Sequence, residues 1–87
     1  MSYDLFFEKQ VLKFLSKLDK NSSKRIIDKI KPLKENPVPH DSKRLVNVKD
    51  KSFRIRIGDF RVLYRIDETG KIIIIFLIDK RSKVYKK

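Results

Sequence analysis

The chain has 87 residues, and its 23 Lys and Arg against 11 Asp and Glu give a formal net charge of +12. A chain this short has room for one hydrophobic core, so we expect a single domain over residues 1–87; because cysteine is absent, a disulfide framework and a thiolate metal site are excluded. The excess positive charge favours a polyanionic partner such as nucleic acid, with solubility or lysine-rich usage as the alternative explanation.

Residues 3–19 predict a short strand followed by a helix. Tyr3, Leu5 and Phe7 alternate along the chain, which is typical of a strand with one apolar face. From residue 8 the apolar spacing changes to three and four residues, which is typical of an amphipathic helix. Its predicted buried stripe consists of Val11, Leu12, Phe14, Leu15 and Leu18. The N-terminus lacks the basic and apolar segments of a secretion signal, so we expect a cytoplasmic protein.

A second helix is predicted to follow at once. Its candidate N-caps are Asn21, Ser22 and Ser23, whose side-chain oxygens can accept the first backbone N–H groups of a helix. Pro32 is expected to kink this helix because it lacks a backbone donor and clashes with the preceding turn. Two further prolines within residues 35–41 predict an extended loop. The predicted buried stripe of the helix is Ile26, Ile27, Ile30 and Leu33.

The rest of the chain predicts an antiparallel meander of four strands. The first contains Leu45, Val46 and Val48, and the others span residues 53–57, 60–66 and 71–78. We therefore expect an α+β fold, with both helices on one face of a four- to five-stranded, mainly antiparallel sheet. Residues 72–78 are all apolar, which predicts an internal strand covered on both faces. This run is far shorter than the roughly 20 residues of a membrane helix, so no membrane span is expected.

The register of one hairpin can be predicted. Gly58 and Asp59 form a two-residue connection, with glycine where a type II′ turn needs positive φ, so Ile57 should pair with Phe60. Counting outward, the apolar pairs fall on one face, while Arg56 faces Arg61 on the other. The arginines predicted to share this second face are Arg54, Arg56, Arg61 and Arg65.

These arginines are candidates for binding phosphate. Like charges directly across a strand pair are mildly destabilising, so Arg56 opposite Arg61 calls for a functional reason. The planar guanidinium group suits phosphate recognition and also stacks on unpaired bases. The alternative is an ordinary solvated sheet face. Residues 79–87 follow the last predicted strand as a basic run, and such runs are commonly disordered tails. The strand before it, however, would bring Arg81 beside the hairpin.

The order of these segments resembles the RelE/ParE toxin superfamily, and RelE in particular. The resemblance rests on residues 53–57 (FRIRI), 58–64 (GDFRVLY), the apolar strand after them and 80–85 (KRSKVY). It also includes the Asn36-Pro37 loop and residues 43–45, and covers nearly the whole chain. It implies a fold related to microbial ribonucleases and a ribosome-dependent endoribonuclease that cleaves mRNA in the A site and inhibits translation.

The resemblance also implies site residues. Arg61, Arg81 and Tyr85 fall on the principal catalytic positions of the family, while Arg54 and Arg56 fall where the best-known bacterial members carry lysines. A guanidinium is effectively never deprotonated, so the general base is left open. Neighbouring cations favour the phenolate form of a tyrosine, which makes Tyr85 the leading proton-transfer candidate. The residues expected to bind RNA are Arg54, Arg56, Arg65, Lys80 and Lys83.

His40 and Tyr64 are the other side chains that could transfer a proton, but a different role is expected for each. His40 lies between Pro39 and Asp41 in the loop, where an exposed polar role is expected. Strand parity places Tyr64 on the apolar face of the hairpin, where a core role is expected. No cofactor or metal is expected.

Several partners are expected for this chain, and two other functions stay possible. The resemblance implies an acidic, RelB-like antitoxin, with the ribosome and mRNA as the other partners and operator DNA bound only through the antitoxin complex. Two alternatives stay open: a ParE-like gyrase inhibitor, which shares the fold without being a nuclease, and a non-enzymatic basic RNA-binding module, which would explain the charge equally well.

Overall fold

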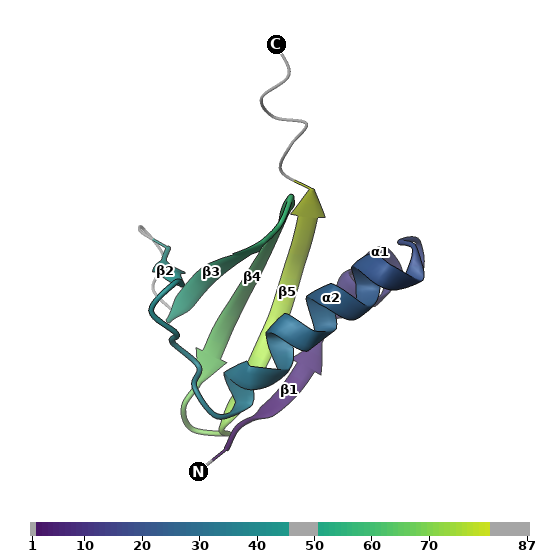
Figure 1. Ribbon diagram of the computed structural model, residues 1–87. Helices are drawn as coiled ribbons and strands as arrows, with labels where there is room; N and C mark the ends of the chain where they lie inside the picture. Colours follow the sequence, from purple (N-terminus) through teal and green to yellow (C-terminus); the bar gives the residue numbers. More distant parts are fainter. Residues whose placement is uncertain (1, 46–50, 81–87) are drawn as a thin grey trace.

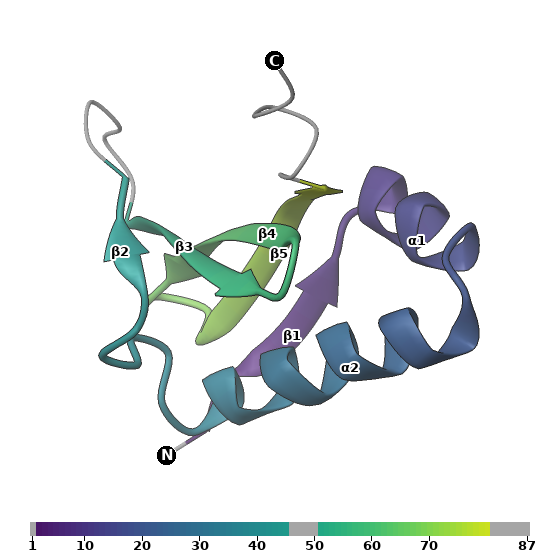
Figure 2. The ribbon, with the colours of Figure 1, turned by 45° about the horizontal axis from the view of Figure 1, so that its top comes forward.

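Two helices cover one face of a five-stranded sheet in the computed structural model, which describes residues 2–45 and 51–80 (Figures 1 and 2). The strand order is β1-β5-β4-β3-β2, with β1 parallel to β5 and all other neighbours antiparallel. The predicted α+β class, meander and placement of the helices are therefore confirmed. The elements are β1 (Asp4–Phe7), α1 (Lys9–Ser16), α2 (Lys20–Ile30), a 3₁₀ turn (Lys31–Lys34), β2 (Lys43–Arg44), β3 (Ser52–Ile57), β4 (Phe60–Asp67) and β5 (Ile72–Lys80).

Helix α1 packs on the sheet through a narrower stripe than predicted. Val11 is buried, but Leu12 is 53% exposed, so its assignment to the buried stripe was wrong. Successive helical residues are about 100° apart, and Leu12 is therefore turned away from the direction shared by Val11, Phe14 and Leu15. The Gln10 amide donates a hydrogen bond to the carbonyl oxygen of Phe76, which ties α1 to β5.

Helix α2 begins earlier than predicted. Its N-cap is Asp19, whose carboxylate accepts a hydrogen bond from the backbone N–H of Ser22 at 3.0 Å. The N-caps predicted at residues 21–23 were wrong because these residues lie inside the helix. The hydrogen bonds from Ser22 also lower the pKa of the Asp19 carboxyl below its usual value. The side-chain hydroxyl of Ser23 instead donates to the carbonyl oxygen of Leu15 at 2.8 Å, which links the two helices.

The prediction of a kink at Pro32 also needs correction. The α-helix ends at Ile30, and the chain continues as a 3₁₀ turn that carries Pro32 in its first positions. A proline in that place removes no hydrogen bond that the turn requires. Neither α1 nor α2 is long and apolar enough to cross a membrane, and this holds for every helix within the described residues.

The core lies between the helices and the sheet. Its fully buried members include Ile26, Ile30, Leu33, Ile55, Val62, Tyr64, Ile73 and Ile75. Tyr64 stacks on Phe53, with ring centroids 5.9 Å apart, and its hydroxyl donates to the carbonyl oxygen of Pro37 at 2.7 Å. Tyr64 thus fastens the proline loop to the sheet, and its predicted core role is confirmed.

The β3–β4 hairpin has the predicted register. Ile57 pairs with Phe60, and Arg56 pairs with Arg61. Gly58 has a φ of +59°, whereas Asp59 is not among the residues with positive φ, a combination that fits a type II′ turn. Strand β2 is Lys43–Arg44 and so precedes the predicted strand: Leu45 lies outside β2, so its assignment to a strand was wrong, and Val46 and Val48 lie outside the described residues.

Strand β5 is internal, as predicted, but it is not covered on both faces. Ile73, Ile75 and Ile78 are buried beneath the helices, whereas Leu77 is 36% exposed and Ile74 is half-buried. The second face of β5 is left uncovered because both helices lie on the same side of the sheet (Figure 2). A β-bulge opposite Leu63 and Tyr64 inserts one extra residue, Phe76, into β5.

Candidate functional site on the open face of the sheet

The sheet face opposite the helices, called here the open face, carries the predicted arginines in an ordered array. Strand pairing arranges its side chains in rows across the strands. The row nearest the hairpin turn is Arg56, Arg61 and Asp79, and the next is Lys43, Arg54, Leu63 and Leu77. The third row is Ser52, Arg65, Ile74 and Phe6. The predicted sharing of one face by the four arginines is therefore confirmed.

Arg61 is held by a carboxylate in its own row. Its Nε donates to Oδ1 of Asp79 at 3.1 Å and its Nη2 donates to Oδ2 at 2.8 Å. Such a two-point contact fixes the plane of the guanidinium group. The negative charge of Asp79 also offsets the repulsion between Arg56 and Arg61 that strand pairing imposes.

Beside this row, the edge of the sheet is hollowed. Asp41, Lys43, Arg54 and Arg56 line a recess of about 310 Å³. Lys43 pairs with Arg54 across the strands, so β2 adds a cation next to those of β3. The Lys29 ammonium lies 3.2 Å from the Asp41 carboxylate and holds the pKa of that carboxyl below its usual value. The recess thus has the charge of an anion-binding surface, with one paired carboxylate at its edge.

The opposite half of the open face is apolar. Phe6 is 55% exposed and lies beside half-buried Ile74 on β5. The guanidinium carbon of Arg65 lies 5.8 Å from the centroid of the Phe76 ring, where the two halves meet. A cation over an aromatic face is favourable. The open face therefore divides into a cationic half on β2, β3 and β4 and a mainly apolar half on β5 and β1, with Asp79 near the end of β5 and Asp4 at the start of β1.

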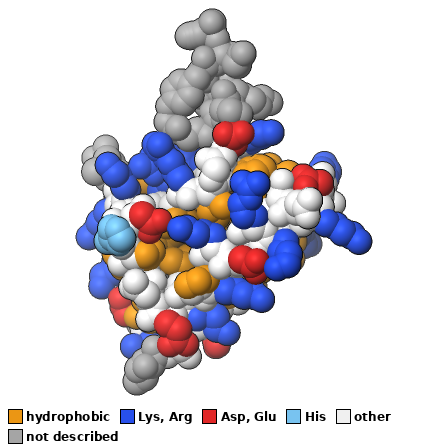
Figure 3. All heavy atoms as spheres, in the orientation of Figure 1, with side chains coloured by type: hydrophobic (Ala, Val, Ile, Leu, Met, Phe, Trp, Pro, Cys, Tyr) orange, Lys and Arg blue, Asp and Glu red, His pale blue; other side chains and the backbone are white. Residues whose placement is uncertain are grey.

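The other predicted site residues fall elsewhere. Lys80 pairs with Phe60, which belongs to the helix-covered side, and its ammonium lies 5.8 Å from the centroid of that ring. Arg81, Lys83 and Tyr85 lie outside the described residues. His40 is exposed, as expected, and is the pale blue side chain in Figure 3. Burial raises the pKa of Tyr64 to about 12, which keeps its hydroxyl protonated and suits it poorly to proton transfer.

Sequence reasoning missed the acidic member of the array. Residues 79–87 were interpreted as a basic tail, but β5 extends to Lys80 and includes Asp79. Tyr64 pairs with Ile75, and Arg61 lies three residues before Tyr64 in β4. In a regular antiparallel pair without the bulge, the partner of Arg61 would therefore lie three residues after Ile75, at Ile78. Asp79 would then point to the opposite face. The change from an unbroken apolar run to an aspartate was a visible signal, but the bulge that aligns it with Arg61 has no clear sequence signature.

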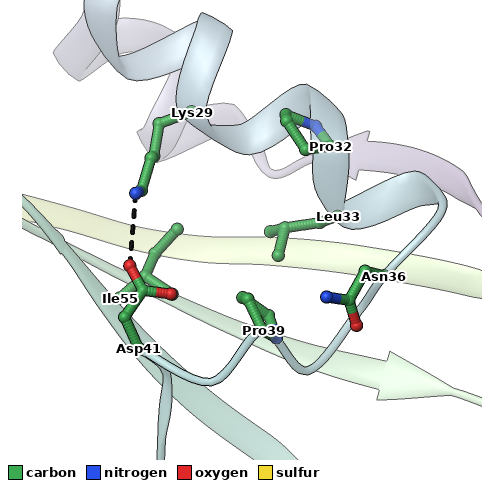
Figure 4. Close-up of a pocket in the computed structure, with 7 residues that line it drawn as sticks. All are labelled: Lys29, Pro32, Leu33, Asn36, Pro39, Asp41 and Ile55. Atoms are coloured by element: carbon green, nitrogen blue, oxygen red, sulfur yellow. Dashed lines mark ion pairs between the residues drawn. The ribbon is translucent and has the colours of Figure 1, made fainter.

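The helix-covered side holds a smaller cavity that does not resemble a catalytic site. Its volume is about 120 Å³, and Lys29 reaches across it to Asp41 (Figure 4). The remaining lining residues are Pro32, Leu33, Asn36, Pro39 and Ile55. On the face of the molecule drawn in Figure 3, acidic side chains are interspersed among the lysine and arginine side chains. Within residues 2–45 and 51–80, no three His, Asp or Glu side chains are grouped so as to hold a metal ion.

Comparison with known proteins gives one consistent result. Residues 5–85 match the family model described as ParE toxin of type II toxin–antitoxin system, parDE. RelE1 of Methanocaldococcus jannaschii is 36% identical over 88 residues, which cover 99% of this chain and 98% of that protein.

Solved structures agree with the sequence matches. A chain of the archaeal RelE–RelB complex from Pyrococcus horikoshii OT3 is 32% identical, with a TM-score of 0.83 over 95% of this chain and 99% of that chain. The toxin–antitoxin complex RelBE2 from Mycobacterium tuberculosis matches at 26% identity and a TM-score of 0.80, over 93% of this chain and 100% of that chain. The isolated E. coli RelE toxin matches at 23% identity and a TM-score of 0.81, over 97% and 92%, which shows a common fold.

Proposed function

The chain belongs to the RelE/ParE superfamily of toxins of type II toxin–antitoxin systems, and on that premise we propose that it is a ribosome-dependent endoribonuclease that cleaves mRNA and so inhibits translation. The observation that carries the proposal is the cationic half of the open face. Arg54, Arg56 and Arg61 lie there on adjacent strands in register. Guanidinium groups suit phosphate recognition and also stack on unpaired bases, so this group of arginines suits a single RNA strand.

Cleavage requires stabilisation of the phosphorane that forms when the adjacent 2′-hydroxyl attacks the phosphate. In the proposed mechanism Arg61 and Arg81 bind the scissile phosphate, and their permanent charges stabilise its additional negative charge. Arg61 is anchored by Asp79, and Arg81 follows in the sequence directly after Lys80, the last residue of β5. Tyr85 is the proposed proton-transfer group, and Arg54, Arg56, Arg65, Lys80 and Lys83 bind flanking RNA.

This chemistry depends on outside help to orient the substrate. Histidine and glutamate, the usual acid–base groups of ribonucleases, are absent from the open-face positions described above. Correct positioning of reacting groups alone can supply several kcal/mol of the barrier reduction. We therefore propose that the ribosome holds the mRNA in the reactive geometry and that RNA alone is a poor substrate.

Mapping of mRNA 5′ ends tests this function directly. Purified protein added to stalled ribosomes should generate new 5′ ends at the codon in the A site. The same mRNA without ribosomes should remain largely intact. Absence of cleavage on ribosomes, with protein shown to be folded by circular dichroism, would contradict the proposal.

We also propose an acidic, RelB-like antitoxin as the partner of this chain. The P. horikoshii and M. tuberculosis relatives were each solved in complex with an antitoxin. The open face here offers both charge complementarity to an acidic segment and an apolar half, with Phe6 and Leu77 exposed, for an amphipathic helix. Through such a complex the toxin would reach operator DNA only indirectly.

Inhibition of gyrase is the second candidate function, because the matching family model is that of the ParE toxins. A gyrase inhibitor would need no cleavage chemistry on the open face. DNA supercoiling by gyrase, assayed with the same preparation, separates the two functions. Inhibition of supercoiling without mRNA cleavage would replace the nuclease with this alternative.

A further inference from the structure

A carboxylate stands at the centre of the proposed catalytic surface. Asp79 accepts hydrogen bonds from both Nε and Nη2 of Arg61. The side chains of Arg61 and Asp79 are 32% and 38% exposed, so the pair lies at the surface. Ion pairs at such exposed positions commonly contribute little to stability, because water screens them. Stability alone gives little reason for a negative charge among cations that are proposed to bind RNA.

The backbone is arranged to make this contact. The bulge at Phe76 shifts β5 by one residue, so that Asp79 rather than Ile78 becomes the strand partner of Arg61. The Gln10 amide binds the carbonyl oxygen of Phe76 and joins the bulge to α1. Strand pairing therefore places Asp79 opposite Arg61, and the bulge that sets this pairing is itself held by a contact from α1.

The contact has two opposing physical consequences. The two-point hydrogen bond restricts the rotamers of a long side chain, so Arg61 meets a phosphate with less loss of conformational entropy. The same carboxylate lowers the positive potential that attracts RNA. Asp79 should thus favour the oriented state of Arg61 while weakening RNA binding.

We propose that Asp79 is a positioning residue for Arg61, which holds the guanidinium in its catalytic orientation at some loss of RNA affinity. This inference rests on the proposed nuclease function. It predicts opposite changes in two measurable quantities when the carboxylate is neutralised. A purely structural residue would weaken binding and catalysis together, whereas a simple electrostatic mask would strengthen both when removed.

The decisive variant is Asp79→Asn, which keeps the size of the side chain but removes the charge and one of the two acceptors. We expect its single-turnover cleavage rate on ribosome-bound mRNA to fall on the order of tenfold or more, since misplacement of a catalytic group by about 1 Å can cost a hundredfold. We expect its affinity for a short single-stranded RNA to be higher than that of the wild type, because the carboxylate no longer lowers the positive potential. Asp4→Asn is the matched control, because Asp4 lies at the far end of the same face and its substitution removes the same charge.

A double-mutant cycle tests whether Asp79 acts through Arg61. Once Arg61→Ala has removed the guanidinium, adding Asp79→Asn should slow cleavage no further. NMR of the arginine side chains supplies a readout apart from activity, since the Arg61 Nε–H should exchange with solvent faster in Asp79→Asn. Thermal unfolding of both variants checks that the fold is retained.

Each outcome distinguishes the inference from the function on which it rests. If the wild type cleaves and Asp79→Asn cleaves at the same rate, the positioning role is wrong while the nuclease function stands. The same conclusion follows if the two substitutions slow cleavage additively. If the wild type itself cuts no ribosome-bound mRNA, the nuclease function fails and the catalytic role of Asp79 fails with it.

Discussion

The two faces of the sheet use the same strands for different purposes. On the helix-covered face, alternate residues of β3, β4 and β5 are almost wholly buried, as Ile55, Val62 and Ile73 illustrate. On the open face, their immediate neighbours are charged or remain partly exposed, as Arg54, Arg61 and Ile74 illustrate. The comparison indicates that stability depends on one face, while the other can hold like charges that a fold alone would disfavour.

The largest expected effect concerns adjacent residues of β5 on opposite faces. Ile73→Ala removes a fully buried side chain and should lower the free energy of unfolding by about 2–5 kcal/mol. Ile74→Ala makes the same chemical change on the open face and should cost about 1 kcal/mol or less, because its side chain is already partly hydrated. Urea denaturation of the two variants measures both values. Equal losses would contradict the division of the sheet into a stabilising and an open face.

The next effect tests the open face by activity. Arg61→Ala should reduce single-turnover cleavage of ribosome-bound mRNA by at least about a hundredfold, or roughly 3 kcal/mol of transition-state stabilisation. Ribosome binding should change little, because the neighbouring cations remain. Arg61→Lys keeps the charge but cannot reproduce the two-point contact with Asp79, and it should recover only part of the rate. Loss of binding in proportion to the loss of cleavage would instead make Arg61 a binding residue.

The strand pairs of the sheet differ in how well the sequence predicts them. The period of two and the turn at Gly58 were enough to predict the pairs of the β3–β4 hairpin from Ile57 with Phe60 out to Phe53 with Tyr64, including Arg56 with Arg61. Local rules succeed there because turn length fixes the register. They could not place β1 beside β5, since parallel pairing between distant segments leaves no local pattern.

Asp79 was missed for a similar reason, because its position opposite Arg61 depends on the pairing between two strands. The pairing of Arg61 with Asp79 depends on a bulge, and a bulge adds one residue without requiring a particular sequence. The N-cap was misplaced because Asp19, Asn21, Ser22 and Ser23 are all good capping residues, so residue type alone does not distinguish Asp19 from the others. The roles of Arg81 and Tyr85 stay predictions.

A smaller, pH-dependent effect belongs to the helix-covered face. Burial raises the pKa of Tyr64 to about 12, against about 10 in an unfolded chain. The folded state therefore retains the phenol proton more strongly, and this contribution to stability is fully present below pH 10 and is lost as the pH rises toward 12. We expect the stability difference between wild type and Tyr64→Phe to fall by about 1.4 kcal/mol between pH 9 and pH 11. A difference that stays constant over this range, measured by urea denaturation, would argue against the burial of this hydroxyl.

The smallest effect separates the faces by their contacts with RNA. Each phosphate contact made by a cation contributes roughly 0.7 to 0.9 to the slope of log affinity against log salt concentration, because binding releases condensed counterions. Arg56→Ala removes a cation from the open face and should lower that slope by about one contact. Lys13→Ala removes the same charge from α1, on the other side of the sheet, and should leave the slope nearly unchanged. Lys80 gives the most informative third variant, since it was predicted to bind RNA yet packs over Phe60 on the helix-covered side. A slope lowered by Lys80→Ala would extend the RNA-binding surface around the end of β5, whereas equal slopes for all three variants would remove the distinction between the two faces in RNA binding.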